Sequence, residues 1–275
     1  MPAVSEIHVY PIKSCRGVPV DAAVVGPRGL EGDRRYMLVD ARGRFLSQRE
    51  QPRMAQISMA FGEHGYDVTA PGQAQLTLPR ELPVTRECEV RVWRDTLVVA
   101  LADAGVNRWF SDFLGLDCGL VYMADTQHRA VGNPAAAFDD EVSFADGAPV
   151  LMISQASLDD LNARLPEQVA MRRFRPNIVV TATAPYAEDG WARVAVGEAE
   201  FDVAWSCARC IITTIDPETA QKDPAGEPLA TLRGYRRLGT GILFGQNLLP
   251  RKLGIVRVGD AVGVTEKSSE AKPVK

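Results

Sequence analysis

"ARVAVGEAEFDVAWSCARCIITTI" occupies residues 192–215 and consists of short segments in which Val, Ile and Ala alternate with other residues. Segments of this length and pattern, separated by Gly or charged residues, predict β-strands. Strands that follow one another this closely, with no helical segment between them, indicate a barrel or a strongly curved sheet. The predicted strands of this half are 177–182, 192–197, 199–205, 210–215 and 254–264.

The first half of the chain carries the same kind of short strands, separated by Gly, Pro and Asp turn signals. A helix is predicted over Asp103–Leu114, because its apolar residues recur at i, i+3, i+4 and i+7 and Gly115 can end it. A second helix follows "PVLMIS" (149–154), with Ser154 or Ser157 as its N-cap. The expected fold class is mainly β with a few helices (α+β). The strands predicted in this half are Glu6–Ile12, Tyr36–Asp40, Tyr66–Ala70, Cys88–Trp93 and Thr96–Leu101.

The composition is that of an ordinary globular protein, and the length suits two domains. The 275 residues include 46% hydrophobic and 24% charged residues, which is ample apolar material for a core. The formal net charge of −4 argues against a nucleic-acid partner, because phosphate neutralisation needs a clustered basic surface. The sequence shows no leader and no apolar run of about 18 residues, so we expect no membrane contact and a cytoplasmic location. The five cysteines are expected to be reduced thiols.

Cys207 and Cys210 form a CxxC pair inside the quoted stretch. A structural zinc site needs four ligands, and no second CxxC or nearby histidine supplies the other two. A thioredoxin-type dithiol lies at a helix N-terminus, whereas a β-branched segment follows here. Arg209 favours a thiolate beside it, so one cysteine could serve as a single ligand for a soft metal. The remaining interpretation is that two buried cysteines merely pack a strand.

Cationic and polar residues stand at the ends of several predicted strands. An ammonium and a hydroxyl come directly after the first strand, where they can hold a phosphate together with backbone N–H groups. Two arginines precede the strand at 36–40, and an arginine and an asparagine open the strand at 177–182. Each alone is compatible with a solvated surface group, but together they predict an anion-binding lining. The residues are Lys13, Ser14, Arg34, Arg35, Arg175 and Asn177.

Two groups of motifs resemble a known family. "IHVYPIKSCRGVPV", "GDRRYMLVD" and "LSQREQPRMAQI" resemble the N-terminal β-barrel domain that precedes a MOSC domain. "FRPNIVV", "YAEDGW", "VGEAEF", "CARCIITTIDPETA", "LFGQN" and "VGD" follow in the order typical of the MOSC domain itself. The resemblance implies an N-terminal β-barrel-like domain at 1–125 and a MOSC β-barrel domain at 126–265, and the polar composition of "EKSSEAKPVK" predicts a frayed tail at 266–275. The resemblance also implies a cofactor cleft between the two domains.

The resemblance further implies a molybdenum-cofactor enzyme, similar to the mitochondrial amidoxime-reducing components and the bacterial YcbX-like proteins. Such enzymes reduce N-hydroxylated compounds, which include amidoximes, hydroxylamines and N-hydroxylated bases. The family's protein ligand to the metal is the cysteine of an "RC" pair, which falls on Cys210 and makes it the expected catalytic residue. The residues that match the family's contacts to a molybdopterin-type cofactor are Lys13, Ser14, Arg35, Arg175, Asn177, Arg209 and Cys210.

Two departures from the family pattern affect these expectations. Gly147 and Ala148 stand where the mitochondrial members have two hydroxyl residues, so a side-chain contact to the cofactor is lost there. The [2Fe–2S] domain common in YcbX-like proteins does not follow the motifs, so we expect electrons from a separate protein of the ferredoxin, flavin reductase or cytochrome b5 type. A non-catalytic module that carries sulfur or cofactor on Cys210 remains the alternative. The roles of Cys207 and Asp216 stay open.

Overall fold

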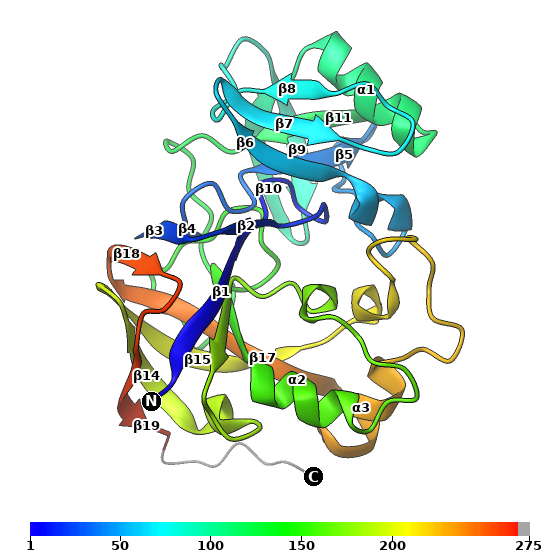
Figure 1. Ribbon diagram of the computed structural model, residues 1–275. Coiled ribbons are helices and arrows are strands. Elements are labelled where there is room, and N and C mark those ends of the chain that lie inside the picture. Colours follow the sequence, from blue (N-terminus) through cyan, green and yellow to red (C-terminus); the bar gives the residue numbers. More distant parts are fainter. Residues whose placement is uncertain (269–275) are drawn as a thin grey trace.

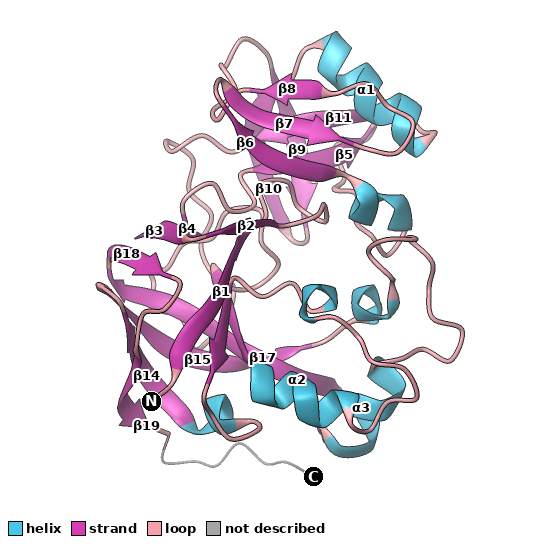
Figure 2. Ribbon diagram, viewed as in Figure 1, coloured by secondary structure: helices cyan, strands magenta, loops and turns pink. Residues whose placement is uncertain are grey.

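A nine-stranded sheet forms the larger part of the computed structural model, which describes residues 1–268 (Figure 1, Figure 2). The strand order is β19-β14-β15-β17-β12-β13-β1-β2, and the short β16 (Arg237–Leu238) pairs with β17. Only β12 and β13 run parallel. The strands are β1 (Ala3–Val9), β2 (Val18–Val20), β12 (Val150–Ser154), β13 (Ile178–Thr181), β14 (Trp191–Val196), β15 (Ala199–Ala208), β17 (Gly241–Lys252) and β19 (Val262–Lys267).

This sheet curls until the start of β1 meets the start of β19. Ala3 forms a bridge with Ala261, and the Val262 amide donates to the Pro2 carbonyl at 2.8 Å. The inward-facing residues of the curled sheet form one apolar core, because side chains alternate between the two faces of a strand. The barrel that the closely spaced strands predict is therefore confirmed. We call this part of the molecule the barrel.

The lobe, residues 36–124, contains a four-stranded and a three-stranded antiparallel sheet. Both faces of the first sheet are buried: Tyr36 and Leu38 enter one apolar cluster, and Met37 and Val39 enter another. Its strands are β5 (Tyr36–Asp40), β11 (Cys118–Tyr122), β10 (Asp95–Leu101) and β9 (Glu87–Val92). The smaller sheet consists of β6 (Ser58–Gly62), β7 (Gly65–Thr69) and β8 (Leu76–Leu78).

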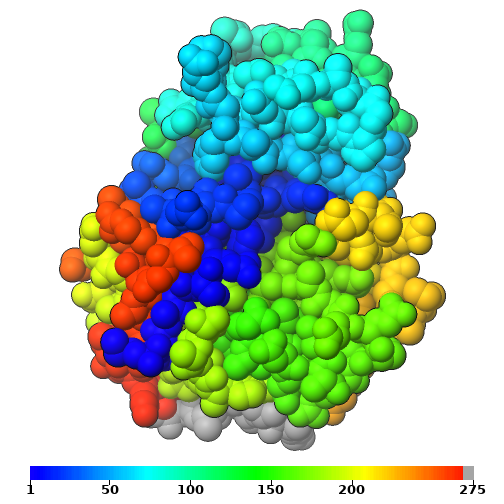
Figure 3. Space-filling model, viewed as in Figure 1, coloured from blue at the N-terminus to red at the C-terminus, as the bar shows by residue number. Residues whose placement is uncertain are grey.

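Most of the first thirty residues lie with the barrel, whereas residues 12–15 join the lobe beside Tyr36. β1 pairs with β13, and β3 (Ala22–Gly26) pairs with β18 (Gly254–Arg257) and with β4 (Gly29–Leu30). Figure 3 shows this blue N-terminal segment lying between the upper lobe and the lower barrel, beside the orange and red C-terminal strands. Gly29 has φ +87°, and a Cβ there would lie 2.5 Å from the Pro149 carbonyl oxygen, so only glycine fits this turn.

The two helices predicted from the sequence are confirmed. In α1 (Ala104–Leu114) the Asp103 side chain accepts from two backbone amides, and Gly115 ends the helix with φ 70°. The Ser154 hydroxyl caps α2 (Gln155–Asn162). A third helix, α3 (Leu229–Tyr235), was not predicted. The 3₁₀ segments are η1 (Pro52–Gln56), η2 (Met171–Arg173), η3 (Ala187–Gly190) and η4 (Ile211–Thr214).

The predicted strand at 210–215 is wrong, because η4 occupies this segment. β15 ends at Ala208, the last residue in register with β17. The threonine hydroxyls then bond back by three residues: Thr213 Oγ1 donates to the Cys210 carbonyl at 3.0 Å, and Thr214 Oγ1 donates to that of Ile211 at 2.8 Å. These bonds let a β-branched sequence form a helical turn despite its strand propensity.

Of the tail predicted to be frayed, Glu266 and Lys267 belong to β19, and residues 269–275 lie outside the described residues. All five cysteines are free thiols. None of the helices within residues 1–268 is long and apolar enough to cross a membrane.

Candidate active site

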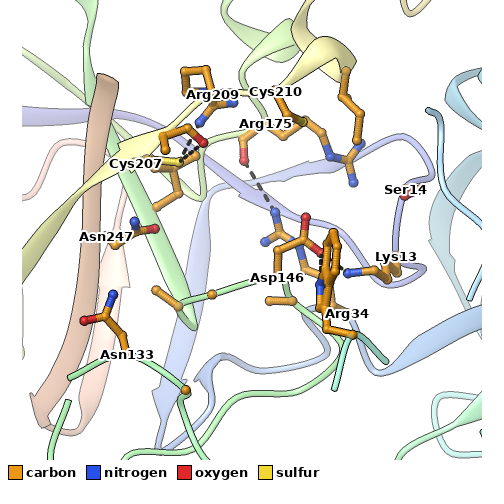
Figure 4. Close-up of a pocket in the computed structure, with 18 of the residues that line it drawn as sticks. Lys13, Ser14, Arg34, Asn133, Asp146, Arg175, Cys207, Arg209, Cys210 and Asn247 are labelled. Carbon is orange, nitrogen blue, oxygen red and sulfur yellow. Dashed lines mark hydrogen bonds and ion pairs between the residues drawn. The ribbon is translucent and has the colours of Figure 1, made fainter. Parts of the chain in front are cut away.

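A cavity of about 850 Å³ lies between the barrel and the lobe and is lined by both (Figure 4). Eight cationic and two acidic side chains line it, although the whole chain has a formal net charge of −4. The cations are Lys13, Arg34, Arg49, Arg91, Arg94, Arg129, Arg175 and Arg209, and the acids are Asp95 and Asp146. Such an excess of positive charge in a concave site attracts and binds anions.

Several residues of the cavity have a strained backbone. Among the described residues, seven other than glycine have positive φ, and four of these line the cavity. They are Ser14 (φ 66°), Arg34 (φ 48°), Trp93 (φ 56°) and Arg175 (φ 58°). A left-handed conformation costs an L-residue about 1–2 kcal/mol, and such strain concentrates at functional sites.

Cys210 lies on the barrel side of the cavity, directly before η4, and its side chain is half-buried. The Arg49 Nη2 of the lobe approaches the Cys210 Sγ at 3.5 Å. This contact places a positive charge directly beside the sulfur. Burial raises the pKa of the Cys15 thiol to about 12, and burial also raises the pKa values of Cys88 and Cys118.

Cys207 and Arg209 lie beside Cys210 and line the same cavity. The Arg209 guanidinium donates to the Cys207 Sγ at 3.0 Å and to the Phe174 carbonyl at 2.5 Å. Arg209 therefore pairs with Cys207 rather than with Cys210. Its Nε is buried without a hydrogen-bond partner in residues 1–268.

The Lys13 ammonium is almost fully buried, with 6% of its side chain exposed, and it donates to the Phe144 carbonyl at 2.7 Å. It also forms an ion pair with Asp146, whose side chain is 49% exposed. Partial burial alone would raise the pKa of Asp146, but the Lys13 charge more than offsets this effect and holds that pKa well below its usual range. Asp146 further accepts from the Trp93 Nε1 at 3.2 Å and pairs with Arg49 at 3.4 Å. One carboxylate thus organises three side chains of the cavity.

Asn177 is buried and joins the barrel to residues 33–34, the segment that leads into the lobe. Its Oδ1 accepts from the Leu151 amide at 3.1 Å and from Arg34 at 3.0 Å, and its Nδ2 donates to the His8 carbonyl and to Asp33. Both amide hydrogens and the carbonyl oxygen are therefore engaged within the protein. Asn177 is placed to hold Arg34 in position, and the cofactor contact expected of it stays a prediction.

Arg35 does not line the cavity, in contrast to the role predicted for it. Its guanidinium donates to the Met123 carbonyl at 2.6 Å and pairs with Asp125 at 2.7 Å, inside the lobe. The neighbouring Arg34 lines the cavity instead. Arg34 stands in a turn with φ 48°, and Arg35 follows it directly before β5, so the two side chains of the "RR" pair have different neighbours.

Arg34 and Arg175 both contact Tyr10, each with its guanidinium carbon 4.3 Å from the ring centre. The Arg175 Nη1 also donates to the Cys15 carbonyl at 2.5 Å. Burial raises the pKa of Tyr10 to about 12, so the ring stays neutral beneath two cations. Ser14 lines the cavity too, and no hydrogen bond to its hydroxyl is present within the described part of the chain.

Asp216 does not line the cavity. Its Oδ1 accepts from the amides of Glu218 and Thr219 at 2.8 and 3.0 Å, and it pairs with Arg173 at 3.1 Å. These contacts are those of a turn-forming aspartate. Gly147 and Ala148 do line the cavity, and a Cβ on Gly147 would meet nothing closer than the Trp205 ring at 3.9 Å.

Of the predicted residues, the structure brings together Lys13, Ser14, Arg175, Asn177, Arg209 and Cys210 around one cavity, and leaves Arg35 outside it. Sequence reasoning missed Arg49, Trp93 and Asp146. Asp146 lies in "FADGAP", directly before Gly147, and as the only charged residue of that segment it was a signal that could have been used.

The donor set fits a phosphorylated, metal-binding cofactor. One half-buried thiol lies beside an arginine, and the guanidinium groups, the ammonium and the Ser14 hydroxyl supply donors for a dianionic phosphate. Within residues 1–268, no group of three or more His, Cys, Asp or Glu side chains is arranged to hold a metal ion.

A barrel and a β-rich lobe thus enclose a cationic cavity that carries a half-buried thiol. Residues 1–117 match the family described as the MOSC N-terminal beta barrel domain, and residues 139–263 match the MOSC domain. The chain therefore belongs to the family of MOSC proteins that carry this N-terminal domain, and the predicted resemblance is confirmed.

Curated relatives extend over most of the chain. Mitochondrial amidoxime reducing component 2 of Bos taurus is 34% identical over 94% of this chain and 82% of its own length. Mitochondrial amidoxime-reducing component 1 of Homo sapiens is 33% identical with the same coverage, 94% and 82%. Molybdenum cofactor sulfurase of Oryza sativa subsp. japonica is 33% identical over 88% of this chain but only 32% of its own length.

Proposed function

We propose that this chain is a molybdenum-dependent reductase of N-hydroxylated compounds, with a molybdopterin-type cofactor in the cavity between barrel and lobe. In the overall reaction the N–O bond of the substrate breaks, two electrons and two protons are consumed, and water leaves. Two amidoxime-reducing components at 33–34% identity over 94% of the chain support the reaction class. The observation that carries the proposal is the half-buried Cys210 thiol, open to a cavity with eight cationic side chains.

The bound cofactor would supply two-electron redox chemistry at the metal, and the protein would hold it and shape the pocket. Cys210 is the proposed protein ligand. Arg34 and Arg175 line the cavity, and they and the Ser14 hydroxyl are suited to hold the cofactor phosphate. Lys13 adds positive charge, and one of its three N–H bonds is left over from its contacts to Phe144 and Asp146.

Asp146 and Arg49 are the groups best placed to act next to Cys210. The same Arg49 nitrogen approaches the Cys210 sulfur at 3.5 Å and an Asp146 oxygen at 3.4 Å. The low pKa of Asp146 keeps it ionised at neutral pH, so it orients Arg49 and balances its charge rather than donating a proton. We expect electrons from a separate protein of the ferredoxin, flavin reductase or cytochrome b5 type, and the cytoplasmic location stays a prediction.

The proposal can be tested with the cofactor-loaded protein, reduced methyl viologen and benzamidoxime. We expect benzamidine to form and about one molybdenum per chain, since a single thiolate ligand is proposed. Cys210→Ala should lose molybdenum and turnover together, whereas Cys207→Ala should keep both. A molybdenum-loaded wild-type sample that forms no benzamidine contradicts the reductase, and metal loss in Cys207→Ala alone contradicts the ligand assignment.

The second candidate function is a carrier of sulfur or cofactor, with Cys210 bearing a persulfide and no turnover. The similarity to a molybdenum cofactor sulfurase over 88% of this chain favours it. Cyanolysis separates the two functions, because a carrier should release about one sulfane sulfur per chain from Cys210. A protein that reduces benzamidoxime and releases no sulfane sulfur is not such a carrier.

A further inference from the structure

Trp93 occupies a turn position that ordinarily belongs to glycine. β9 and β10 form a hairpin in which Val92 pairs with Asp95, so Trp93 and Arg94 make a two-residue loop. Hairpin loops of two residues favour a positive φ at the first position, and glycine or asparagine supplies it without strain. Trp93 has φ 56°, and a bulky residue in this conformation is a true outlier.

Burial does not account for a tryptophan at this position. The Trp93 side chain remains 46% exposed although it is a large apolar group, and it lines the cavity. Trp205 also lines the cavity and is half-buried, whereas the third aromatic residue of the lining, Phe174, is fully buried. Accessible aromatic surface in this otherwise cationic cavity therefore comes from the two tryptophans.

The Trp93 ring is held in one orientation. Its Nε1 donates to Asp146 at 3.2 Å, and the Phe45 ring packs against it with centroids 5.0 Å apart. The neighbouring Arg94 donates to the Gly132 carbonyl at 2.9 Å and fastens the turn to the loop across the cavity. A fixed, half-exposed ring loses little entropy when a ligand stacks on it.

Arg49 connects this ring to the proposed metal ligand. Its guanidinium carbon lies 5.1 Å from the Trp93 ring centre, and its Nη2 lies 3.5 Å from the Cys210 sulfur. A group that reacts beside Cys210 can therefore extend over Trp93 within the same cavity. Flat conjugated rings gain about 1–3 kcal/mol from stacking on an aromatic side chain, and small aliphatic groups do not.

We propose that Trp93 is a specificity-determining residue that selects substrates whose N-hydroxylated group is conjugated to a flat aromatic ring. This inference rests on the proposed reductase function for the identity of the reacting group. The stacking itself requires only the cavity and the ring. The hairpin keeps a strained tryptophan because glycine, although better suited to the turn, would leave no surface for the substrate ring.

Kinetics of the cofactor-loaded protein with one aromatic and one aliphatic substrate test the proposal. For Trp93→Gly we expect KM for benzamidoxime to rise roughly tenfold with kcat within about twofold, and KM for acetamidoxime to stay within about twofold. Trp93→Phe should retain most of the selectivity. Phe61→Gly is the matched control, because Phe61 is an aromatic residue of the lobe with the same 46% exposure and lies outside the cavity lining. Equal changes for the two substrates in Trp93→Gly overturn the proposal.

A binding measurement separates this inference from the proposed function. Benzamide and acetamide carry no N–O bond, so their dissociation constants, measured by ligand-observed NMR, need no turnover. Trp93→Gly should weaken benzamide roughly tenfold and leave acetamide unchanged. Suppose that wild type reduces neither amidoxime but Trp93→Gly still binds benzamide more weakly than wild type does: the reductase function then fails and the stacking role stands. Suppose instead that wild type reduces both amidoximes but benzamide binds wild type and Trp93→Gly equally well: only the stacking role then fails.

Discussion

The two walls of the cavity are held in place by different means. The barrel wall carries Cys207, Arg209 and Cys210 at the end of β15, where the Arg209 amide still donates to the Ile242 carbonyl of β17 at 2.7 Å. The opposite wall, here called the lobe wall, carries residues 49 and 93–94 of the lobe and the adjoining residues 13–14 and 34, all of which lie in turns. Sheet register thus positions the sulfur, whereas bends in the chain position most of the charges around it.

Strain and cross-cavity contacts set the lobe wall apart. Ser14, Arg34 and Trp93 all have positive φ, whereas Arg175 is the one such residue of the cavity on the barrel side. The lobe wall also depends on partners from across the cavity, such as Asp146 for Lys13. The positions of the side chains on the lobe wall therefore depend on the polar groups that bind them. Substitutions of those polar groups test this difference between the two walls.

The largest expected effect is on the stability of the connection itself. Asn177→Leu removes a buried amide that serves four partners, so we expect the free energy of unfolding to fall by about 3 kcal/mol, because several groups lose their hydrogen bonds. Urea unfolding measures the loss. Asn107→Leu is the matched control, since Asn107 bonds only within the lobe, to Ala102 and Leu120. Asn107→Leu should destabilise the protein without releasing cofactor, whereas Asn177→Leu should also release it, because Arg34 loses a partner that holds it at the cavity. Equal cofactor loss in the two variants would contradict the connecting role of Asn177.

The next effect distinguishes two adjacent arginines. Arg34→Ala removes a cation of the cavity, and we expect the affinity for the cofactor to fall roughly 30-fold, or about 2 kcal/mol. Arg35→Ala removes a guanidinium that bonds to Met123 and Asp125 inside the lobe, so cofactor content should stay as in wild type. Pterin released after dialysis measures the difference. Cofactor loss confined to Arg35→Ala would restore the assignment made from sequence.

A pH-dependent effect tests the Lys13–Asp146 pair. The pKa of Asp146 is lower in the folded protein than its ordinary value of 3.8, so its contribution is complete above that pH and is lost as the pH falls further. Asp146→Asn should lower the free energy of unfolding by about 1–2 kcal/mol at pH 7, a value reduced for its 49% exposure. The difference between the two proteins should begin to shrink once the pH falls below about 4 and should keep shrinking as the pH falls further. A constant difference from pH 7 to pH 3 would exclude the ion pair as its source.

The smallest expected effect comes from Gly147→Ser, which places a hydroxyl residue where the family pattern has one. Gly147→Ser adds a hydroxyl to the cavity, and its Cβ fits because the nearest atom would be 3.9 Å away. We expect the cofactor to dissociate roughly threefold more slowly, which corresponds to one added hydrogen bond of about 0.6 kcal/mol. Gly190→Ser, outside the cavity lining, is the control and should not change dissociation. A faster dissociation in Gly147→Ser would show that the backbone there already serves the ligand.

Local patterns predicted the elements well where they agreed with tertiary packing. The helix at 103–114 follows from its apolar spacing, with Asp103 and Gly115 at its ends, and the strand at 36–40 follows from its Val, Leu and Tyr content. The segment at 210–215 failed, because the last residue in register with β17 is Ala208 and hydroxyl bonds replaced strand pairing after it. Propensity decides only where no partner strand or side chain overrides it.

The sequence by itself determined the family, the mainly β architecture and the cysteine at the centre of the site, because these depend on motifs and periodicities that lie within short segments. Tertiary structure alone decided which arginine of "RR" faces the cavity, that Asn177 is engaged within the protein, and that Arg49, Trp93 and Asp146 line the same cavity as Cys210. Each of these depends on contacts between residues more than 40 positions apart, such as Trp93 with Asp146. Such contacts exist only after the lobe has folded against the barrel.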